Sequence, residues 1–203
     1  PFDTKAPHLI DQLISEGYNS GRFRTTLDLY LQDTVQQVLA SNRERLRESG
    51  ASQAAAIVVH NPSMDVLATA GSFEYSEKDS GYNNGVLAHY SAGSTLKPFL
   101  YGLALESGYT ATTLLEDTER KYRSRQGQYS PYNFDRKEYG PVTIRTALGN
   151  SLNLSAVRML QLIGQERFYE LLKEIKLINN PRHNAEHYGL GLAIGNPEIS
   201  LEQ

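Results

Sequence analysis

A proline four residues after a serine, at the start of an apolar run, most constrains how this chain folds. Residues 94–105 read Ser-Thr-Leu-Lys-Pro-Phe-Leu-Tyr-Gly-Leu-Ala-Leu, and the run ends at Gly108. Proline has no backbone N–H, so a helix accepts it without loss only in the first turn, where that N–H would have no intrahelical partner. Pro98 therefore predicts a buried helix that begins close to Ser94.

Helical and extended segments are predicted on both sides of this helix. Asp28 is a suitable cap for a long helix, and Gly50 is a suitable end for it. Two short apolar runs, residues 54–60 and 66–72, flank a polar turn that contains a proline, which predicts a β-hairpin. Helices are predicted again over residues 143–177.

The two ends of the chain differ from the part between them. Residues 1–24 mix proline and glycine with a few apolar residues, so we interpret them as a linker or lead-in with one weak helical turn. Residues 25–203 are predicted to form the folded part. Within it, residues 196–203 resemble the start of a further helix.

Charge and composition exclude several classes of function. Twenty Lys and Arg against 23 Asp and Glu give a formal net charge of -3, so no overall basic field attracts nucleic acid or an anionic membrane. No apolar run approaches the roughly 18 to 20 residues of a membrane-spanning helix. The sequence has no cysteine, which excludes thiolate chemistry and Cys-ligated zinc. His183 and His187 have metal-ligand spacing, but the neighbouring Pro181 favours a surface loop.

Ser94 and Lys97 lie three residues apart at the predicted helix start, so their side chains project from one face. A serine hydroxyl is a weak nucleophile until a neighbour takes its proton, and a lysine can do so only when neutral. That requires burial to lower the lysine pKa by roughly three from about 10.4, at a cost near 4 kcal/mol. The pair is either a nucleophile with its base, or a helix cap followed by a solvated lysine. The apolar run behind Lys97 favours the first.

Ser151 and Asn153 form a second candidate pair, 57 residues after Ser94. In a turn between two helices their side chains can point together into a cleft, where the hydroxyl relays a proton and the amide holds a peptide group of a substrate. A capping residue and a turn residue explain the same pattern.

As a set, these residues resemble the first two of three active-site motifs of the penicillin-recognising serine acyl transferases: Ser94-Thr95-Leu96-Lys97, then Ser151-Leu152-Asn153. The surrounding sequence is similar to the transpeptidase domain of class A penicillin-binding proteins. The similar segments are Thr25-Thr26-Leu27-Asp28, Ala92-Gly93 with Pro98-Phe99, Tyr132-Asn133-Phe134-Asp135, residues 140–148 and Ser155-Ala156-Val157-Arg158.

The resemblance implies a role for each of the four residues. Ser94 is expected to attack the penultimate D-alanine carbonyl of a peptidoglycan stem peptide, and Lys97 to accept its proton. Ser151 is expected to pass a proton to the leaving D-alanine, and Asn153 to bind the substrate's amide backbone. The expected partners are stem peptides and β-lactams, the compartment is extracytoplasmic, and no metal or organic cofactor is required.

The implied fold is an α+β fold of the serine β-lactamase and penicillin-binding-protein transpeptidase type, with a helical region beside an antiparallel sheet. The family's third motif, Lys followed by Thr or Ser and then Gly, is absent from the 203 residues. We therefore expect residues 25–203 to be the N-terminal part of the domain, with an incomplete sheet and impaired activity. An unpaired strand edge predicts self-association, partial disorder or capture of a neighbour's strand. The family's upstream glycosyltransferase domain and membrane anchor are absent here, so we expect no membrane contact.

Three functions remain open at this point. The first is D,D-transpeptidation. The second is a serine β-lactamase or β-lactam sensor, which shares Ser94 and Lys97 but in the class A β-lactamases adds a glutamate that activates water; the surroundings of Glu174 match that setting only roughly. The third is a non-catalytic interaction module in which the same residues are caps.

Overall fold

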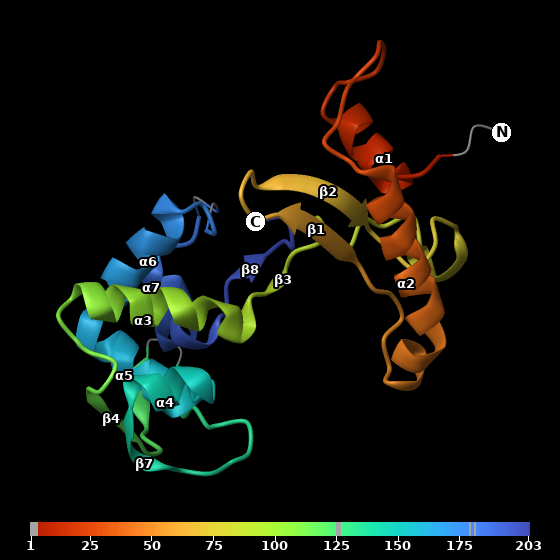
Figure 1. Cartoon of the computed structure of the whole chain (residues 1–203). Helices are drawn as coiled ribbons and strands as arrows, with labels where there is room; N and C mark the ends of the chain where they lie inside the picture. The colour runs from red at the N-terminus through yellow and green to blue at the C-terminus, as the bar shows by residue number, and fades with distance from the viewer. Residues whose placement is uncertain (1–3, 125–126, 179, 181) are drawn as a thin grey trace. The chain divides into compact units, whose positions relative to one another are not determined.

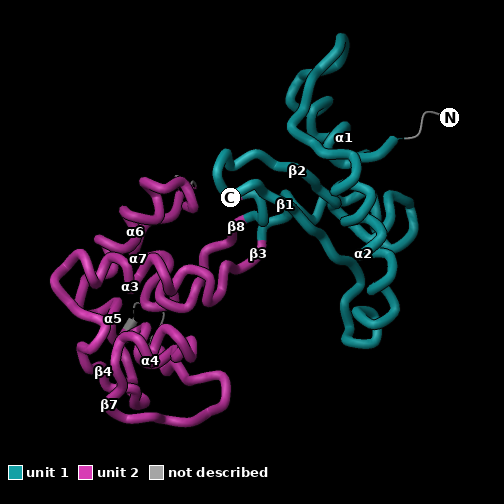
Figure 2. The backbone as a smooth tube through the Cα atoms, viewed as in Figure 1, with its two compact units in different colours: residues 1–89, 200–202 teal, residues 90–199, 203 magenta. Residues whose placement is uncertain are grey.

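The computed structural model describes residues 4–124, 127–178, 180 and 182–203. The chain divides into two compact units (Figure 2). Unit 1 comprises residues 1–89 and 200–202, and unit 2 comprises residues 90–199 and 203.

Unit 1 consists of two helices, a hairpin and a short 3-10 turn (Figure 1). These elements are α1 (Pro7–Ser15), α2 (Leu29–Glu48), β1 (Ala56–His60), β2 (Asp65–Ala70) and η1 (Lys78–Ser80). The predicted long helix and its cap are confirmed, because Asp28 accepts a hydrogen bond from the Leu31 backbone N–H at 2.9 Å. The predicted hairpin is also confirmed, with an antiparallel register that shifts between Val58 and Val59.

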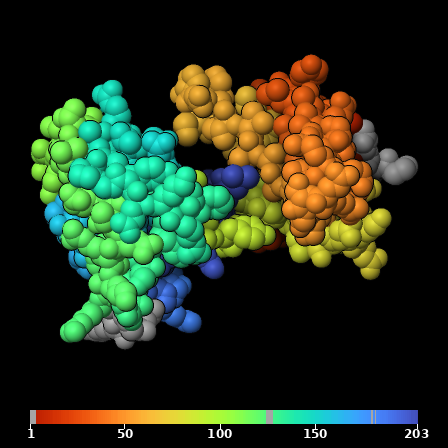
Figure 3. All heavy atoms as spheres, turned by 90° about the horizontal axis from the view of Figure 1, so that it is seen from below, coloured from red at the N-terminus to blue at the C-terminus, as the bar shows by residue number. Residues whose placement is uncertain are grey.

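Helix α2 packs on the hairpin through one buried polar side chain and a small apolar cluster. Gln32 is fully buried; its Nε2 donates to Thr69 O at 2.8 Å, and its Oε1 accepts from Thr69 N at 2.9 Å. The two bonds satisfy backbone groups of β2 that the hairpin leaves unpaired at its edge. In the space-filling view α2 is the orange surface (Figure 3). Tyr30 of this helix is 79% exposed.

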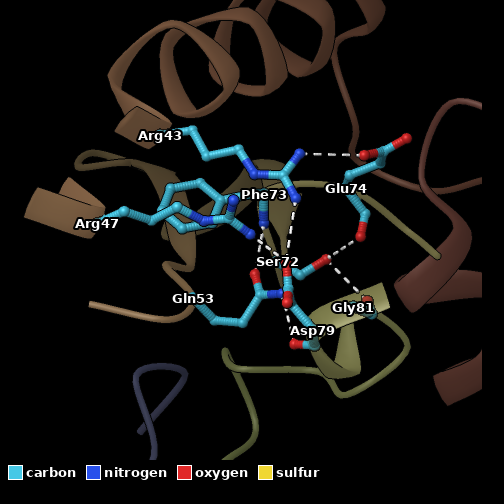
Figure 4. Close-up of polar contacts among 8 residues, drawn as sticks. All are labelled: Arg43, Arg47, Gln53, Ser72, Phe73, Glu74, Asp79 and Gly81. Carbon is cyan, nitrogen blue, oxygen red and sulfur yellow. Dashed lines mark hydrogen bonds and ion pairs between the residues drawn. The ribbon is translucent and has the colours of Figure 1, made fainter. Parts of the chain in front are cut away.

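A polar cluster fixes the loop that follows β2 (Figure 4). Arg43 forms an ion pair with Glu74, and both Arg43 and Arg47 pair with Asp79. Gln53 accepts from the Phe73 backbone N–H and donates to the Asp79 carbonyl. The arginines come from α2, so this cluster ties the end of that helix to a loop that has no strand partner of its own.

Unit 2 contains most of the helices and three short antiparallel strand pairs (Figure 1). Its first half consists of β3 (Tyr90–Ser91), η2 (Gly93–Leu96), α3 (Lys97–Glu106), β4 (Leu114–Asp117), β5 (Tyr122–Ser124), β6 (Gly127–Tyr129) and β7 (Gly140–Thr143). Its second half consists of α4 (Ile144–Gly149), α5 (Asn153–Ile163), α6 (Gln165–Glu174), α7 (Ala185–Tyr188), η3 (Gly189–Ile194) and β8 (Glu198–Ile199). The pairs are β3 with β8, β4 with β7 and β5 with β6.

The core of unit 2 is built around α5. Ala156, Val157, Met159 and Leu160 of this helix are completely buried. Helix α3 packs against α5 through side chains that include Leu100, which is also completely buried. Because the apolar residues of α5 occupy most of its circumference, the helix is enclosed by neighbours, and its N-terminus is held at a fixed place within the unit.

One prediction about the end of the chain is wrong. Residues 196–203 were predicted to start a helix, whereas Glu198 and Ile199 form β8 and pair with β3. The preceding Gly195 has φ +79° and lies so close to Gly93 that a Cβ at this position would collide with the Gly93 backbone. This close approach favours the strand pairing over a local helix, because only glycine fits there.

The helices in the described ranges lack the combination of length and apolar character that crossing a bilayer requires.

Candidate active site

Ser94 and Lys97 lie at the junction between a 3-10 turn and a helix. Ser94 belongs to η2, and α3 begins at Lys97. The α-helix therefore starts three residues after Ser94, the position near which its start was predicted. Pro98 occupies the first turn of α3, as predicted from its missing N–H. The Lys97 backbone N–H donates to Ser94 O. Residues i and i+3 of a 3-10 turn eclipse each other, so the two side chains lie on the same side.

The two side chains differ sharply in exposure. Ser94 is exposed, whereas Lys97 is 1% exposed. An exposed hydroxyl can meet a substrate, and the buried Lys97 amine is shielded from water. The two exposures fit a serine nucleophile with a lysine base.

The Lys97 amine joins the two candidate motifs. Its Nζ donates to Ser151 O at 2.5 Å, to Ser151 Oγ at 3.1 Å and to Asn153 Oδ1 at 2.6 Å. A lysine ammonium has three N–H donors, and these contacts use all of them. Lys97, Ser151 and Asn153 are therefore in direct contact. Within the described residues no hydrogen bond links Ser94 Oγ to Lys97 Nζ, so Ser94 is not part of this hydrogen-bonded group.

Burial lowers the pKa of Lys97 from 10.5 to about 8, and the charge of Asp117 acts in the opposite direction with a smaller effect. Desolvation penalises the charged ammonium, whereas a nearby carboxylate stabilises it. At pH 7 a lysine with a pKa of 8 is neutral about 9% of the time, against about 0.03% at 10.5. The structure thus provides most of the pKa change that the sequence argument requires.

The turn that carries Ser151 is the C-terminal cap of α4. Ser151 N donates to Leu148 O at 3.0 Å, and Leu152 N donates to Ala147 O at 2.9 Å, which is the bonding pattern of a Schellman motif. Ser151 occupies the left-handed position of this motif, with φ +53°. Glycine is the usual residue there, and a serine costs roughly 1–2 kcal/mol. In this conformation both the carbonyl and the hydroxyl of Ser151 face Lys97.

Asn153 begins α5, and its amide is held on both sides. The Oδ1 atom accepts from Lys97 Nζ, and Nδ2 donates to Tyr132 O at 2.9 Å. The backbone N–H of Asn153 donates to Asn133 Oδ1 at 2.7 Å. The segment around Asn133 therefore forms one wall of the site. Its only signal in the sequence is that it belongs to the family-like stretch of residues 132–135.

Asp117 is a residue of this region that the sequence argument missed. It is completely buried and accepts hydrogen bonds from Ser155 and Asn133, which lie next to the site. In the sequence Asp117 stands in an acidic stretch beside Glu116 and Glu119, so it resembles a solvated loop residue. Nothing in the local pattern indicates that β4 buries it.

The two histidines at metal-ligand spacing form a ring stack. The His183 and His187 centroids are 3.7 Å apart, and His183 Nδ1 lies 3.2 Å from the Tyr188 hydroxyl. The described part of the chain contains no group of three or more potential metal ligands. The neighbouring Pro181 lies outside the described residues.

Known proteins of similar sequence identify the family. The family model of the penicillin binding protein transpeptidase domain matches residues 54–189. Penicillin-binding protein 1C of Escherichia coli (strain K12) is 38% identical over 187 residues, which cover 90% of this chain and 23% of that protein. Penicillin-binding protein 1F of Bacillus subtilis (strain 168) is 32% identical over 190 residues, 93% of this chain and 24% of that protein.

Solved structures support the fold. The crystal structure of penicillin-binding protein 1A from Haemophilus influenzae matches with a TM-score of 0.65 at 27% identity, over 74% of this chain and 22% of that one. The penicillin-binding protein PonA1 from Mycobacterium tuberculosis, solved in complex with penicillin V, matches with a TM-score of 0.68 at 17% identity, over 97% of this chain and 56% of that one. These matches confirm the predicted α+β fold class.

The chain spans about a quarter of the length of the curated relatives named above. Within that span the family model, the relatives and the solved structures agree. This chain therefore belongs to the family of penicillin-binding protein transpeptidase domains.

Proposed function

We propose that this chain contributes the nucleophile and the proton-transfer groups of a penicillin-sensitive D,D-transpeptidase, which cross-links peptidoglycan stem peptides through an acyl-enzyme on Ser94. The observation that carries the proposal is the contact of the buried Lys97 amine with both Ser151 and Asn153. A lysine that served only as a solvated helix residue would be neither buried nor bonded to a turn 54 residues away.

In this proposal acylation proceeds in two proton transfers. Neutral Lys97 has a lone pair and two N–H groups, so it keeps two of its three present contacts and takes the Ser94 proton as the serine oxygen attacks the D-alanine carbonyl. The resulting ammonium donates to Ser151 Oγ. In the structure the distance from Lys97 Nζ to this atom is 3.1 Å, the longest of the three Lys97 contacts. Ser151 then passes its own proton to the leaving D-alanine nitrogen as the C–N bond breaks.

Deacylation reverses the path with a different nucleophile. The amine of a second stem peptide attacks the Ser94 ester, loses a proton through Ser151 to Lys97, and forms the cross-link as Ser94 recovers its hydrogen. In this proposal Asn153, whose amide the Tyr132 carbonyl orients, holds the donor peptide. A β-lactam opened by Ser94 leaves its amine tethered to the acyl group, so the amine cannot depart and the ester persists.

The proposed chemistry indicates a compartment for the protein, and the proposal also assigns parts of the chain to the domain. Stem peptides are cross-linked outside the cytoplasm, so we place the protein there. We propose residues 25–203 as part of the transpeptidase domain and residues 1–24, which contain α1, as its lead-in. Self-association through an unpaired strand edge stays a prediction.

Mass spectrometry of the chain after incubation with benzylpenicillin tests the proposal. We expect a penicilloyl adduct on Ser94, no adduct in Ser94→Ala, and persistence of the adduct for hours. Loss of one oxyanion-hole donor typically slows catalysis 100- to 1000-fold. For residues 1–203, which contain no Lys-Thr/Ser-Gly motif, we expect acylation to be slower by about this factor than in a transpeptidase domain that has the motif. Labelling that survives Ser94→Ala would contradict the proposal, and release within seconds would indicate a β-lactamase.

A further inference from the structure

Asp117 is a buried carboxylate that the proposed proton transfers do not use. It ends β4 and is 0% exposed. Its Oδ1 accepts from the backbone N–H of Ser155 at 3.0 Å and from the Ser155 hydroxyl at 2.7 Å. Its Oδ2 accepts from Asn133 Nδ2 at 2.7 Å and from the Tyr139 backbone N–H at 3.3 Å. Four donors satisfy the carboxylate and hold it in one orientation.

Asn133 connects this carboxylate to the start of α5. Its Nδ2 donates to Asp117 and to a backbone carbonyl of its own loop at 2.9 Å, which leaves Oδ1 facing the helix. That oxygen accepts from the backbone N–H groups of Asn153 at 2.7 Å and Leu154 at 3.2 Å. With the bond from Asp117 to Ser155, three N–H groups of the first turn of α5 are satisfied by side chains from other segments.

This tertiary cap replaces the local cap that α5 lacks. The residue at the N-cap position is Leu152, whose side chain is buried and accepts no hydrogen bond. A carboxylate near the N-terminus of a helix also interacts favourably with the helix dipole. Asp117 therefore stabilises α5 at the end that carries Asn153.

Asn153 of the capped turn and Ser151, two residues before it, both accept from the Lys97 amine. Ser151 has the left-handed conformation, which a serine keeps only when its surroundings hold it. We propose that Asp117, acting through Asn133, is a positioning residue that holds residues 151–153 in the geometry that binds the Lys97 amine. The inference deepens the proposed function and rests on it for its kinetic consequence.

The negative charge of Asp117 also affects the pKa of Lys97. It raises this pKa, whereas burial lowers it by a larger amount. The groups that contact the amine, from Ser151 and Asn153, are neutral. Tyr101, one turn along α3, stays protonated because burial raises its pKa well above the ordinary value. Removing the Asp117 charge should therefore lower the pKa of Lys97 further and move the acidic limb of the acylation rate to lower pH.

The variant Asp117→Asn keeps the shape and removes the charge. In either orientation its NH₂ group meets a donor, from Ser155 or from Asn133, so the cap is disturbed. We expect Ser94-dependent acylation by benzylpenicillin to slow about 100-fold, the cost of a misplacement near 1 Å. We also expect faster amide hydrogen exchange at residues 153–155. The exposed neighbour on the same strand gives the matched control, Glu116→Gln, which should leave both unchanged.

A second substitution tests the connection through Asn133. In Asp117→Asn with Asn133→Asp, the new amide donates to the new carboxylate, whose other oxygen accepts from the N–H groups of Asn153 and Leu154. The bonds to the Lys137 carbonyl and from the Tyr139 N–H are lost, so the rescue is partial. We expect this double variant to recover at least tenfold of the lost rate, whereas Asn133→Asp alone places two carboxylates in contact and should be the least stable of the set.

The outcomes separate this inference from the proposed function. Absence of Ser94-dependent labelling in the wild type defeats the proposed function, while the exchange measurement still tests the cap. Labelling and exchange in Asp117→Asn equal to those in Glu116→Gln would overturn the inference alone, as would a folded double variant no faster than the single one. If Asp117→Asn does not fold, Ser155→Ala keeps the charge and removes one bond; we expect a three- to tenfold slower rate, and an unchanged rate overturns the inference.

Discussion

Raising the pH from 6 to 8 should accelerate acylation of Ser94 about 50-fold, and raising it from 8 to 10 should add only about a further twofold. The reason is the buried amine of Lys97, whose pKa is lowered to about 8. Only the neutral amine accepts the serine proton, and its fraction is about 1% at pH 6, 50% at pH 8 and 99% at pH 10. A lysine at its ordinary pKa would instead give about a 75-fold rise between pH 8 and 10.

The assay is the initial rate of penicilloyl-adduct formation, followed by mass spectrometry in buffers of constant ionic strength. Ser94→Ala corrects for labelling elsewhere, and hydrolysis of the free β-lactam at each pH is measured in parallel. Lys97→Met removes the base, so it should abolish the rise of the acylation rate between pH 6 and 8 together with most of the rate itself. A rate that continues to climb steeply from pH 8 to 10 would refute the argument that burial tunes this lysine.

The same lysine should leave a signature in stability. Below pH 8 both the folded and the unfolded chain hold the proton, and the folded state bears the desolvation penalty. Between pH 8 and 10.5 the unfolded state binds more protons than the folded state, so the free energy of unfolding rises with pH. Relative to Lys97→Met, denaturant titrations should show a rise of about 3 kcal/mol across this window. A difference in the free energy of unfolding between the wild type and Lys97→Met that does not change with pH would contradict the lowered pKa.

Three further substitutions test the packing. Gly195→Ala places a Cβ against the Gly93 backbone at a positive φ, so we expect a loss of roughly 3 kcal/mol or more in a urea titration and loss of Ser94 labelling; a variant as stable as the wild type would contradict the contact. Gln32→Leu leaves both polar groups of Thr69 unpaired in a buried place, which should cost about 2–5 kcal/mol and speed exchange of the Thr69 amide. Phe134→Ser changes a side chain that is 99% exposed, so the free energy of unfolding from a urea titration should stay within about 0.5 kcal/mol of the wild type.

The sequence alone determined those features that depend on neighbours in the chain. Asp28 caps α2 because its carboxylate reaches an N–H three residues later, and Pro98 marks the first turn of α3 because of its own missing N–H. The spacing of Ser94 and Lys97 likewise placed both side chains on one side of a turn. Ser151 and Asn153 were found as a pair by spacing, and the resemblance gave them a function.

Only the tertiary structure decided how these parts act on one another. The sequence places Lys97 in a helix but does not show whether it is buried. Its pKa is lowered because residues far along the chain exclude water from it. Asp117 reads as one of several acidic loop residues, yet β4 buries it under the start of α5. Residues 196–203 favour a helix locally, but Glu198 and Ile199 within them pair as a strand, because Gly195 lets the chain approach Gly93. Burial and long-range pairing depend on contacts between distant segments, which no local pattern records.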